Sequence, residues 1–161
     1  KKKKGIGSTF TVYIKALPTK HTSNKNIENE LKNLIYDFSK YRILIVEDNS
    51  VNQTVLTKFL AKSNANYQIV ENGLEAVKEI SINSYDLILM DCQMPVMDGF
   101  EATQKIREFN KEIIVIALTA NAMIEEKDKC LNVGMNDFLS KPINKNILLN
   151  TLNKWLNKKG A

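Results

Sequence analysis

The chain has 161 residues, of which 43% are hydrophobic, and this is enough to bury the core of one ordinary domain plus an appendage. The net charge of +5 is carried by the first forty residues, where nine lysines stand against three acidic residues and four of the lysines form the run Lys1 to Lys4. A basic run without aromatic or helix-turn-helix context is typical of a solvated terminus and speaks against nucleic-acid binding. No stretch approaches the roughly 18 apolar residues of a membrane helix, and Cys92 and Cys130 lack metal-ligand spacing. We expect a cytoplasmic chain with reduced thiols and no membrane contact.

The first 40 residues differ in kind from the rest of the chain. Residues 9–14 alternate polar and apolar side chains and predict one strand, and residues 18–25 form a polar linker. Residues 26–40 predict a short amphipathic helix. Neither element can bury its apolar face alone, so we expect both to pack on the following domain or on another copy of the chain, which leaves a homodimer open.

From Arg42 onward, five short apolar runs alternate with five helical patterns, which is typical of a parallel α/β sheet. The predicted strands are Arg42–Val46, Tyr67–Val70, Asp86–Met90, Ile113–Leu118 and Asn136–Leu139. The predicted helices begin at Ser50 and then cover 73–82, 98–108, 122–132 and 144–157. Two of the strands contain unbroken apolar runs, as strands covered on both faces should.

The first and last helices carry clear apolar stripes. Ser50-Val51-Asn52-Gln53 has the pattern of a capping box, which predicts Ser50 as the cap of the first helix. Its stripe consists of Val51, Val55, Leu56, Phe59 and Leu60. The stripe of the last helix consists of Ile147, Leu148, Thr151, Leu152, Trp155 and Leu156. We expect both helices to pack on the sheet.

Polar side chains follow the predicted strands where the strands end. Glu47 and Asp48 follow the first strand, Asp91 the third, Thr119 the fourth and Lys141 the fifth. The carboxyl ends of parallel strands meet at one edge, where three carboxylates repel by about 1–4 kcal/mol per pair at about 4 Å. Oxygen ligands without His or Cys favour Mg²⁺ over Zn²⁺ or a caged Ca²⁺. A lysine and a hydroxyl beside them suit the charge of a phosphoryl group.

Four segments resemble the motifs of two-component response-regulator receiver domains, over about residues 41–158. They are ILIVEDN (43–49), DLILMDCQMPVMDG (86–99), IALTANA (116–122) and GMNDFLSKP (134–142). The resemblance implies a flavodoxin-like (βα)5 fold, a doubly wound parallel five-stranded sheet, here with an N-terminal strand and helix as an appendage. It also implies a Mg²⁺-dependent phosphoacceptor that takes a phosphoryl group from phosphohistidine and then changes conformation.

The resemblance assigns a role to each acidic residue at the sheet edge. Asp91 is implied as the phosphoacceptor. Asp48 and Asp91 are implied as direct Mg²⁺ ligands together with the backbone carbonyl of Gln93, and Glu47 as a ligand through a coordinated water.

The resemblance also implies residues that read the phosphoryl group. Thr119 and Lys141 would hold its oxygens, and Phe138 stands at the aromatic switch position. Phe in place of the commoner Tyr leaves no ring hydroxyl, which favours a switch based on packing. Gln93 and Asn121 border the approach of the phosphoryl group and are expected to tune its lifetime.

The loop after Asp91 is expected to be structural. In Met94–Gly99, the proline and the glycine set a turn and Asp98 is available to cap the next helix. Pro142 is implied by the resemblance to follow a cis peptide bond that aims Lys141.

The N-terminal segment resembles the end of a histidine-kinase ATPase domain, through Gly5-Ile-Gly-Ser-Thr-Phe. We therefore expect a remnant of that domain in 1–17, a linker with a short helix in 18–40, and a receiver in 41–158. The parent would be a hybrid histidine kinase, a phosphotransferase that can be membrane-anchored elsewhere, whereas the receiver catalyses only its own phosphorylation and dephosphorylation. His21 lacks an acidic neighbour and is expected to be a linker histidine.

The expected partner is a histidine kinase dimerisation and phosphoacceptor domain or a histidine-containing phosphotransfer protein. It would dock near Asn49, Ser50 and Asn52, because a helical donor must bring its imidazole in line with Asp91. Two other functions stay open: a degenerate receiver that serves as an interaction scaffold, and a Mg²⁺ phosphatase of the aspartyl-phosphate type. The phosphatase would need a second acid at position 93, which is Gln.

Overall fold

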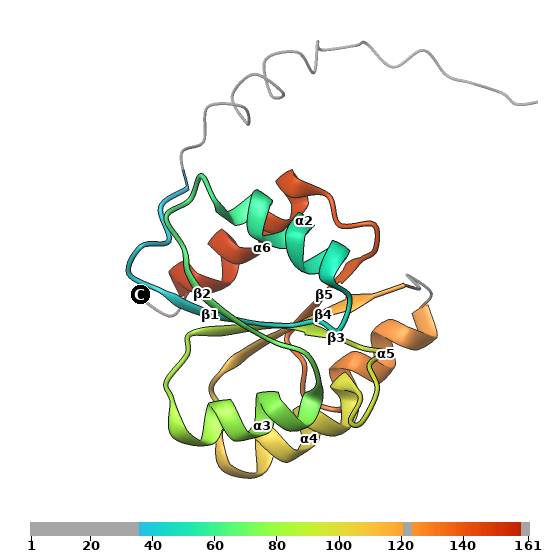
Figure 1. Ribbon diagram of the computed structural model, residues 1–161. Helices are drawn as coiled ribbons and strands as arrows, with labels where there is room; N and C mark the ends of the chain where they lie inside the picture. The colour runs from blue at the N-terminus through green and yellow to red at the C-terminus, as the bar shows by residue number, and fades with distance from the viewer. Residues whose placement is uncertain (1–35, 121–123, 159–161) are drawn as a thin grey trace, which may run out of the picture. The chain divides into compact units, whose positions relative to one another are not determined.

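The computed structural model describes residues 36–120 and 124–158, along which strands and helices alternate (Figure 1). The elements are β1 (Arg42–Val46), α2 (Ser50–Leu60), β2 (Asn66–Val70), α3 (Gly73–Ile82), β3 (Leu87–Asp91), α4 (Gly99–Phe109), β4 (Ile114–Thr119), α5 (Ile124–Asn132), β5 (Asp137–Ser140) and α6 (Lys145–Lys158). Among these helices none is both long and apolar enough for a membrane crossing.

The five strands form one parallel sheet in the order β2-β1-β3-β4-β5. Helices α2 and α6 cover one face of the sheet, and α3, α4 and α5 cover the other (Figure 1). This arrangement confirms the predicted doubly wound fold. The strand order reverses between β1 and β3, so the connections that follow these two strands leave towards opposite faces and a crevice opens at their carboxyl ends.

The central strands are buried on both faces. Side chains of Leu44, Val46, Ile88 and Met90 enter the apolar cluster under α3, α4 and α5. Their neighbours along β1 and β3 enter the second cluster, under α2 and α6. Alternating direction along a strand therefore explains the unbroken apolar runs, because each face of the sheet has its own core.

Three strands run one residue later than predicted. β3, β4 and β5 each begin and end one position further on, so Asp91 and Thr119 are the last residues of their strands. The ladder pairs Asp91 with Leu118 and Thr119 with Ser140. A polar side chain does not interrupt the backbone hydrogen bonds of a ladder, so the pairing continues into the functional residues.

Helix α2 begins at Ser50 as predicted, but the predicted cap is wrong by one residue. Asn49 is the cap, and its side chain accepts hydrogen bonds from the backbone N–H groups of Val51 and Asn52. The Gln53 amide donates instead to the carbonyl of Glu47 at 2.7 Å, so it cannot close a capping box. Val51 is 68% exposed and does not belong to the buried stripe, because Asn52 and Gln53 are the residues of the first turn that face Glu47.

The predicted apolar stripe on α6 also needs correction, at its first residue. Leu148, Leu152 and Leu156 are fully buried, and Trp155 is half-buried against the same core. Ile147 is 56% exposed. Leu149 takes a buried position instead, because it lies three residues before Leu152 and residues three or four apart share a face of a helix.

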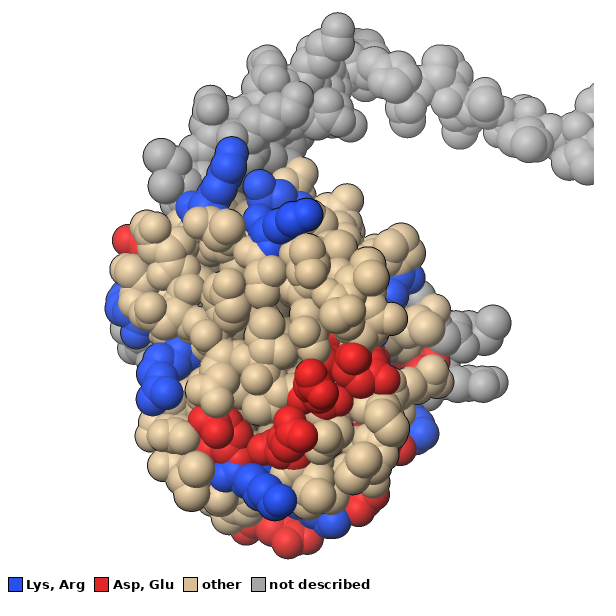
Figure 2. Space-filling view, in the orientation of Figure 1, with Lys and Arg blue, Asp and Glu red and all other residues tan. Residues whose placement is uncertain are grey.

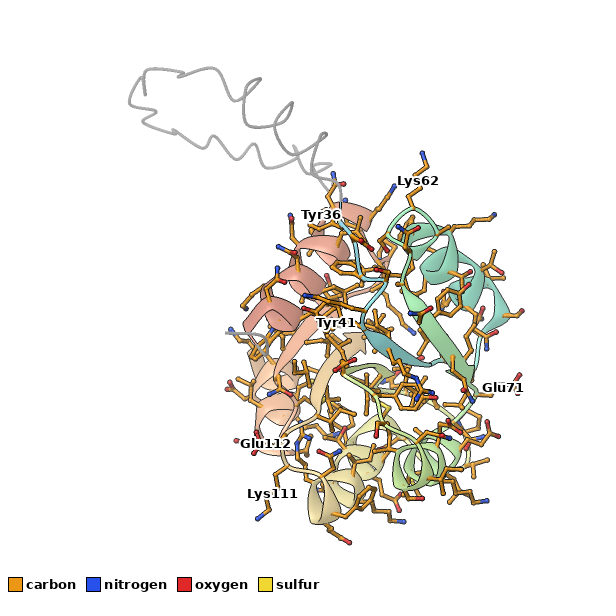
Figure 3. All side chains as sticks on the ribbon, turned by 90° about the vertical axis from the view of Figure 1, so that its left-hand side faces the viewer. Tyr36, Tyr41, Lys62, Glu71, Lys111 and Glu112 are labelled. Carbon is orange, nitrogen blue, oxygen red and sulfur yellow. The ribbon has the colours of Figure 1, made fainter. Side chains whose placement is uncertain are left out.

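The segment before β1 belongs to the packed domain. Tyr36–Lys40 is not helical, so the predicted helix over 26–40 is wrong in this part, and residues 1–35, with the predicted strand 9–14, lie outside the described residues. Phe38 is 2% exposed and its N–H donates to the carbonyl of Ser63. Figure 3 shows Tyr36 and Tyr41 beside α6, where the Tyr36 hydroxyl bonds the Asn150 side chain. Phe38 thus joins the core from a segment that is not helical.

Candidate functional site

Three carboxylates meet at the carboxyl ends of β1 and β3. Oxygen atoms of Glu47, Asp48 and Asp91 lie within 4.8 Å of one another. The register that pairs Val46 with Met90 brings the following residues side by side. Glu47 is fully buried and Asp91 nearly so, while Asp48 is exposed. Such a group of buried acids requires positive charge nearby.

Lys141 supplies one positive charge from the loop after β5. Its Nζ atom lies 2.7 Å from Asp91 Oδ2 and 2.8 Å from Glu47 Oε2. The Lys141 backbone N–H donates to the carbonyl of Thr119 at 2.7 Å, which anchors the loop at the sheet edge. The Lys141–Pro142 peptide bond is cis. With three carboxylates and one ammonium group, the cluster keeps an excess of two negative charges when all are ionised.

Burial and charge shift the pKa values of this pair. Burial raises the pKa of the Asp91 carboxyl, and the nearby Glu47 charge raises it further. For Lys141, burial by itself lowers the pKa, but hydrogen bonds to Asp91 and Glu47 outweigh it and the pKa is raised. The Lys141 ammonium group therefore stays charged, but it offsets only part of the negative charge around an ionised Asp91.

Two amide side chains of α2, which the sequence reasoning did not assign to the site, hold Glu47. Asn52 Nδ2 donates to Glu47 Oε1 at 2.7 Å, and Gln53 Nε2 donates to the Glu47 carbonyl at 2.7 Å. The backbone N–H of Asn49 lies 3.4 Å from the same Oε1. A usable signal was present in the sequence, because polar residues in the first turn of a helix that follows a strand-end acid face the sheet edge.

The remaining predicted site residues lie around this cluster. Thr119 is buried at the end of β4. Gln93 is exposed, and its N–H donates to Asp91 Oδ1 at 3.2 Å. Phe138 is half-buried against the core under α5, and the Nζ atom of Lys127 lies 5.4 Å from its ring centre. Asn121 lies outside the described residues.

The loop between β3 and α4 closes tightly on Asp91. A Cβ atom added to Gly99 would lie 2.1 Å from the Asp91 carbonyl oxygen, so only glycine fits there. Asp98 caps α4 as predicted, accepting from the Glu101 N–H at 2.8 Å. Earlier in the same loop, the Met97 N–H donates to the Pro95 carbonyl across Val96, which has φ +71°. Such a three-residue turn is strained for a β-branched residue.

The oxygen ligands of this cluster fit a hard divalent cation. Carboxylate oxygens are the ligands that Mg²⁺ prefers, and neither cysteine is among them. Cys92 and Cys130 are free and buried, with their sulfur atoms 4.0 Å apart. Burial raises the pKa of both thiols, so they remain protonated rather than acting as metal ligands. Figure 2 shows Asp and Glu side chains gathered below the middle of the visible face, with Lys and Arg mostly towards its margins.

The family model of the response regulator receiver domain matches residues 43–153, and the chain belongs to this family. It is a receiver domain of phosphorelay signalling, a phosphoacceptor module in a family whose members are phosphorylated on aspartate and bind Mg²⁺. The particular relatives include hybrid signal transduction histidine kinase B of Dictyostelium discoideum, 48% identical over 130 residues, which are 72% of this chain and 7% of the kinase. Hybrid signal transduction histidine kinase K of the same organism is 35% identical over 84% of this chain and 12% of that protein. The chain thus spans a small part of these relatives.

Solved structures agree with this assignment. The chain is similar to the receiver domain of Saccharomyces cerevisiae Ssk1, solved with the histidine phosphotransfer signalling protein Ypd1, with 35% identity, a TM-score of 0.74, and coverage of 80% of this chain and 95% of that one. It is also similar to the receiver domain of the Pseudomonas aeruginosa sensor histidine kinase PA1611, solved with a magnesium ion in its active site cleft. That pair has 42% identity and a TM-score of 0.68, over 73% of this chain and 98% of the other.

Proposed function

We propose that Asp91 is the phosphoacceptor of this receiver domain and takes its phosphoryl group from a phosphohistidine. The observation that carries this proposal is the contact of one ammonium group, on Lys141, with both Asp91 and Glu47 inside a cluster of three carboxylates. A carboxylate oxygen of Asp91 attacks phosphorus, a P–O bond forms, the P–N bond breaks, and the imidazole leaves with its electron pair.

The proposed metal site uses the same residues. Asp48 and Asp91 bind Mg²⁺ through their carboxylates, Gln93 through its backbone carbonyl, and Glu47 through a coordinated water. Mg²⁺, when bound, offsets negative charge on the transferred group. The proposal is supported by the excess negative charge of the cluster and by the all-oxygen ligand set.

Other residues of the site hold and report the phosphoryl group. Thr119 donates its hydroxyl and Lys141 its ammonium group to the phosphoryl oxygens. Phe138 acts as a switch through packing, supported by its half-buried position at the edge of a core. Gln93 and Asn121 tune the lifetime of the phosphoryl group.

The proposed partner is a histidine-containing phosphotransfer protein or the phosphoacceptor domain of a histidine kinase. It docks on the exposed first turn of α2, where Ser50 and Val51 face solvent next to the acidic cluster. The receiver of Ssk1, solved with Ypd1, supports this class of partner. Asn52, which is also expected at this surface, is half-buried and donates its amide to Glu47. Charge introduced at Val51 should slow transfer from a protein donor and leave labelling by acetyl phosphate unchanged; equal rates would refute the docking site.

The proposed parent is a cytoplasmic or membrane-anchored hybrid histidine kinase. Its ATPase domain would end in residues 1–17, and residues 18–40 would form a linker. The described part of this linker, Tyr36–Lys40, is not helical, and its Phe38 is buried. The hybrid kinases among the relatives support this context.

The test is incubation with Mg²⁺ and acetyl phosphate, followed by intact mass measurement and peptide mapping. Wild type should gain one phosphoryl mass on Asp91, and D91A should gain none. D128A removes an exposed acid on α5 and should be labelled like wild type. Failure of wild type to be labelled would favour the scaffold alternative, and sustained release of phosphate from phosphate esters would favour the phosphatase alternative.

A further inference from the structure

We propose that Asn52 is a positioning residue of the phosphoryl-transfer site, which acts through Glu47 and contacts neither the phosphoryl group nor the metal. This inference rests on the proposed function of Asp91 and its Mg²⁺ site. It concerns a residue on the first turn of α2, away from the strand ends that supply the other groups.

The carboxylate of Glu47 needs a partner for each oxygen, because it is 0% exposed. Lys141 Nζ serves Oε2 at 2.8 Å, and Asn52 Nδ2 serves Oε1 at 2.7 Å. The other contact of Oε1, with the N–H of Asn49, is 3.4 Å long and therefore weak. Asn52 is thus the main partner of one half of a buried charged group.

The two partners of Glu47 differ in what else they do. Lys141 is shared with Asp91 and must also meet the incoming phosphoryl group, so its hold on Glu47 changes during the reaction. Asn52 has no such second task among the contacts of the described residues. Its hydrogen bond keeps the carboxylate oriented while Lys141 is engaged elsewhere.

The amide is also the right chemical type for this position. A cation at position 52 would cancel the charge of Glu47, and a carboxylate would repel it. A neutral donor fixes the rotamer and leaves intact the excess negative charge that attracts a divalent cation. The Asn49 cap and the Gln53 bond to the Glu47 carbonyl fix the first turn, so the Asn52 side chain is delivered in one orientation.

The test replaces Asn52 by leucine, which has similar volume and no donor. A cavity of about 100 Å³ lined in part by Val55, Leu56 and Ile143 adjoins Asn52 and can accommodate the apolar side chain. Mg²⁺ binding is measured by calorimetry at pH 7 without a phosphodonor. We expect N52L to bind Mg²⁺ about tenfold more weakly than wild type, as for the loss of an outer partner of a metal ligand. N157L changes an exposed asparagine on α6 and should bind like wild type.

A double-mutant cycle with E47Q separates positioning from a general structural effect. If Asn52 acts through Glu47, N52L should add nothing to the loss of Mg²⁺ affinity in the E47Q background. Additive losses, or unchanged affinity in N52L, would overturn the inference. N52A provides the same readout should N52L not fold by circular dichroism. The proposed function fails separately, if wild type is not labelled on Asp91 by acetyl phosphate.

Discussion

Replacement of Asp91 by asparagine should stabilise the domain when Mg²⁺ is absent. The Asp91 carboxylate is 5% exposed and lies within 4.8 Å of the oxygens of two other acids. Asparagine keeps the shape and the acceptor for the Gln93 N–H but carries no charge. D91N therefore removes a buried charge that the fold holds at a cost.

The magnitude follows from the distances in the site. At an effective dielectric constant of about 20, the ion pair with Lys141 at 2.7 Å is worth about 6 kcal/mol. Repulsion from Glu47 and Asp48, each within 4.8 Å, costs at least about 3.5 kcal/mol apiece, so these charge terms nearly cancel. What remains is the desolvation of a buried carboxylate, which costs several kcal/mol, less the smaller cost of burying an amide. We expect D91N to raise the free energy of unfolding by about 1–3 kcal/mol.

The assay is urea unfolding of wild type and D91N at pH 7 in EDTA, followed by circular dichroism. D128N, an exposed Asp to Asn change, should stay within about 0.5 kcal/mol of wild type. Added Mg²⁺ should stabilise wild type more than D91N and reduce the difference, because only the wild-type site keeps all its ligands.

The pH dependence has a definite sign. The pKa of Asp91 is raised above 3.8 in the folded state, so the folded protein binds a proton at Asp91 more readily than the unfolded chain does. The ionised Asp91 carboxylate therefore destabilises the fold fully at a pH above its folded-state pKa, and this destabilisation disappears as the pH falls towards 3.8. The advantage of D91N should therefore shrink on acidification. A D91N protein that is less stable than wild type at pH 7 in EDTA would refute the reasoning.

Three further predictions concern the surroundings of Asp91. G99A should destabilise the domain by more than about 2 kcal/mol and reduce its labelling by acetyl phosphate, because the added Cβ would lie 2.1 Å from the Asp91 carbonyl oxygen. Unchanged stability of G99A in urea unfolding would contradict this prediction. V96N should raise stability by about 0.5–1 kcal/mol in the same assay, because asparagine tolerates the positive φ; no gain would argue against strain. Cys92 and Cys130 should resist iodoacetamide at pH 8 until urea is added, as checked by intact mass; rapid native alkylation would contradict their burial and raised pKa values.

Local patterns in the sequence were enough to predict the sheet and the members of the acidic cluster. Apolar runs such as Ile43–Val46 depend on burial that any parallel sheet imposes, so the fold class could be predicted without coordinates. The edge cluster followed from one topological rule, because all parallel strands place their carboxyl ends together. The one-residue shifts of β3 and β4 escaped prediction, since ladder hydrogen bonds depend on backbone pairing and not on side-chain polarity.

The helix predictions were wrong at Val51 and at Phe38, two apolar residues that both fit a helical period. Val51 lies four residues before Val55, yet it is exposed, because Asn52 and Gln53 are the residues of the first turn that face Glu47. Phe38 also fits a helical period, yet Tyr36–Lys40 is not helical, and Phe38 is buried in the core under α2 and α6. Periodicity describes which side of a helix is apolar, and it contains no information on which distant residues each side meets.

Residue patterns alone were enough to predict the parallel α/β fold, the oxygen-rich strand ends and the resemblance to receiver domains. The hydrogen bonds between side chains, in contrast, depend on how distant segments pack in the folded chain. Lys141 donates to the carboxylate of Glu47 across 94 positions of the chain, and Asn52 donates to the same carboxylate from the first turn of α2. Such pairings depend on rotamers selected by packing between distant segments, whereas the patterns that define strands and helices act over a few neighbouring residues.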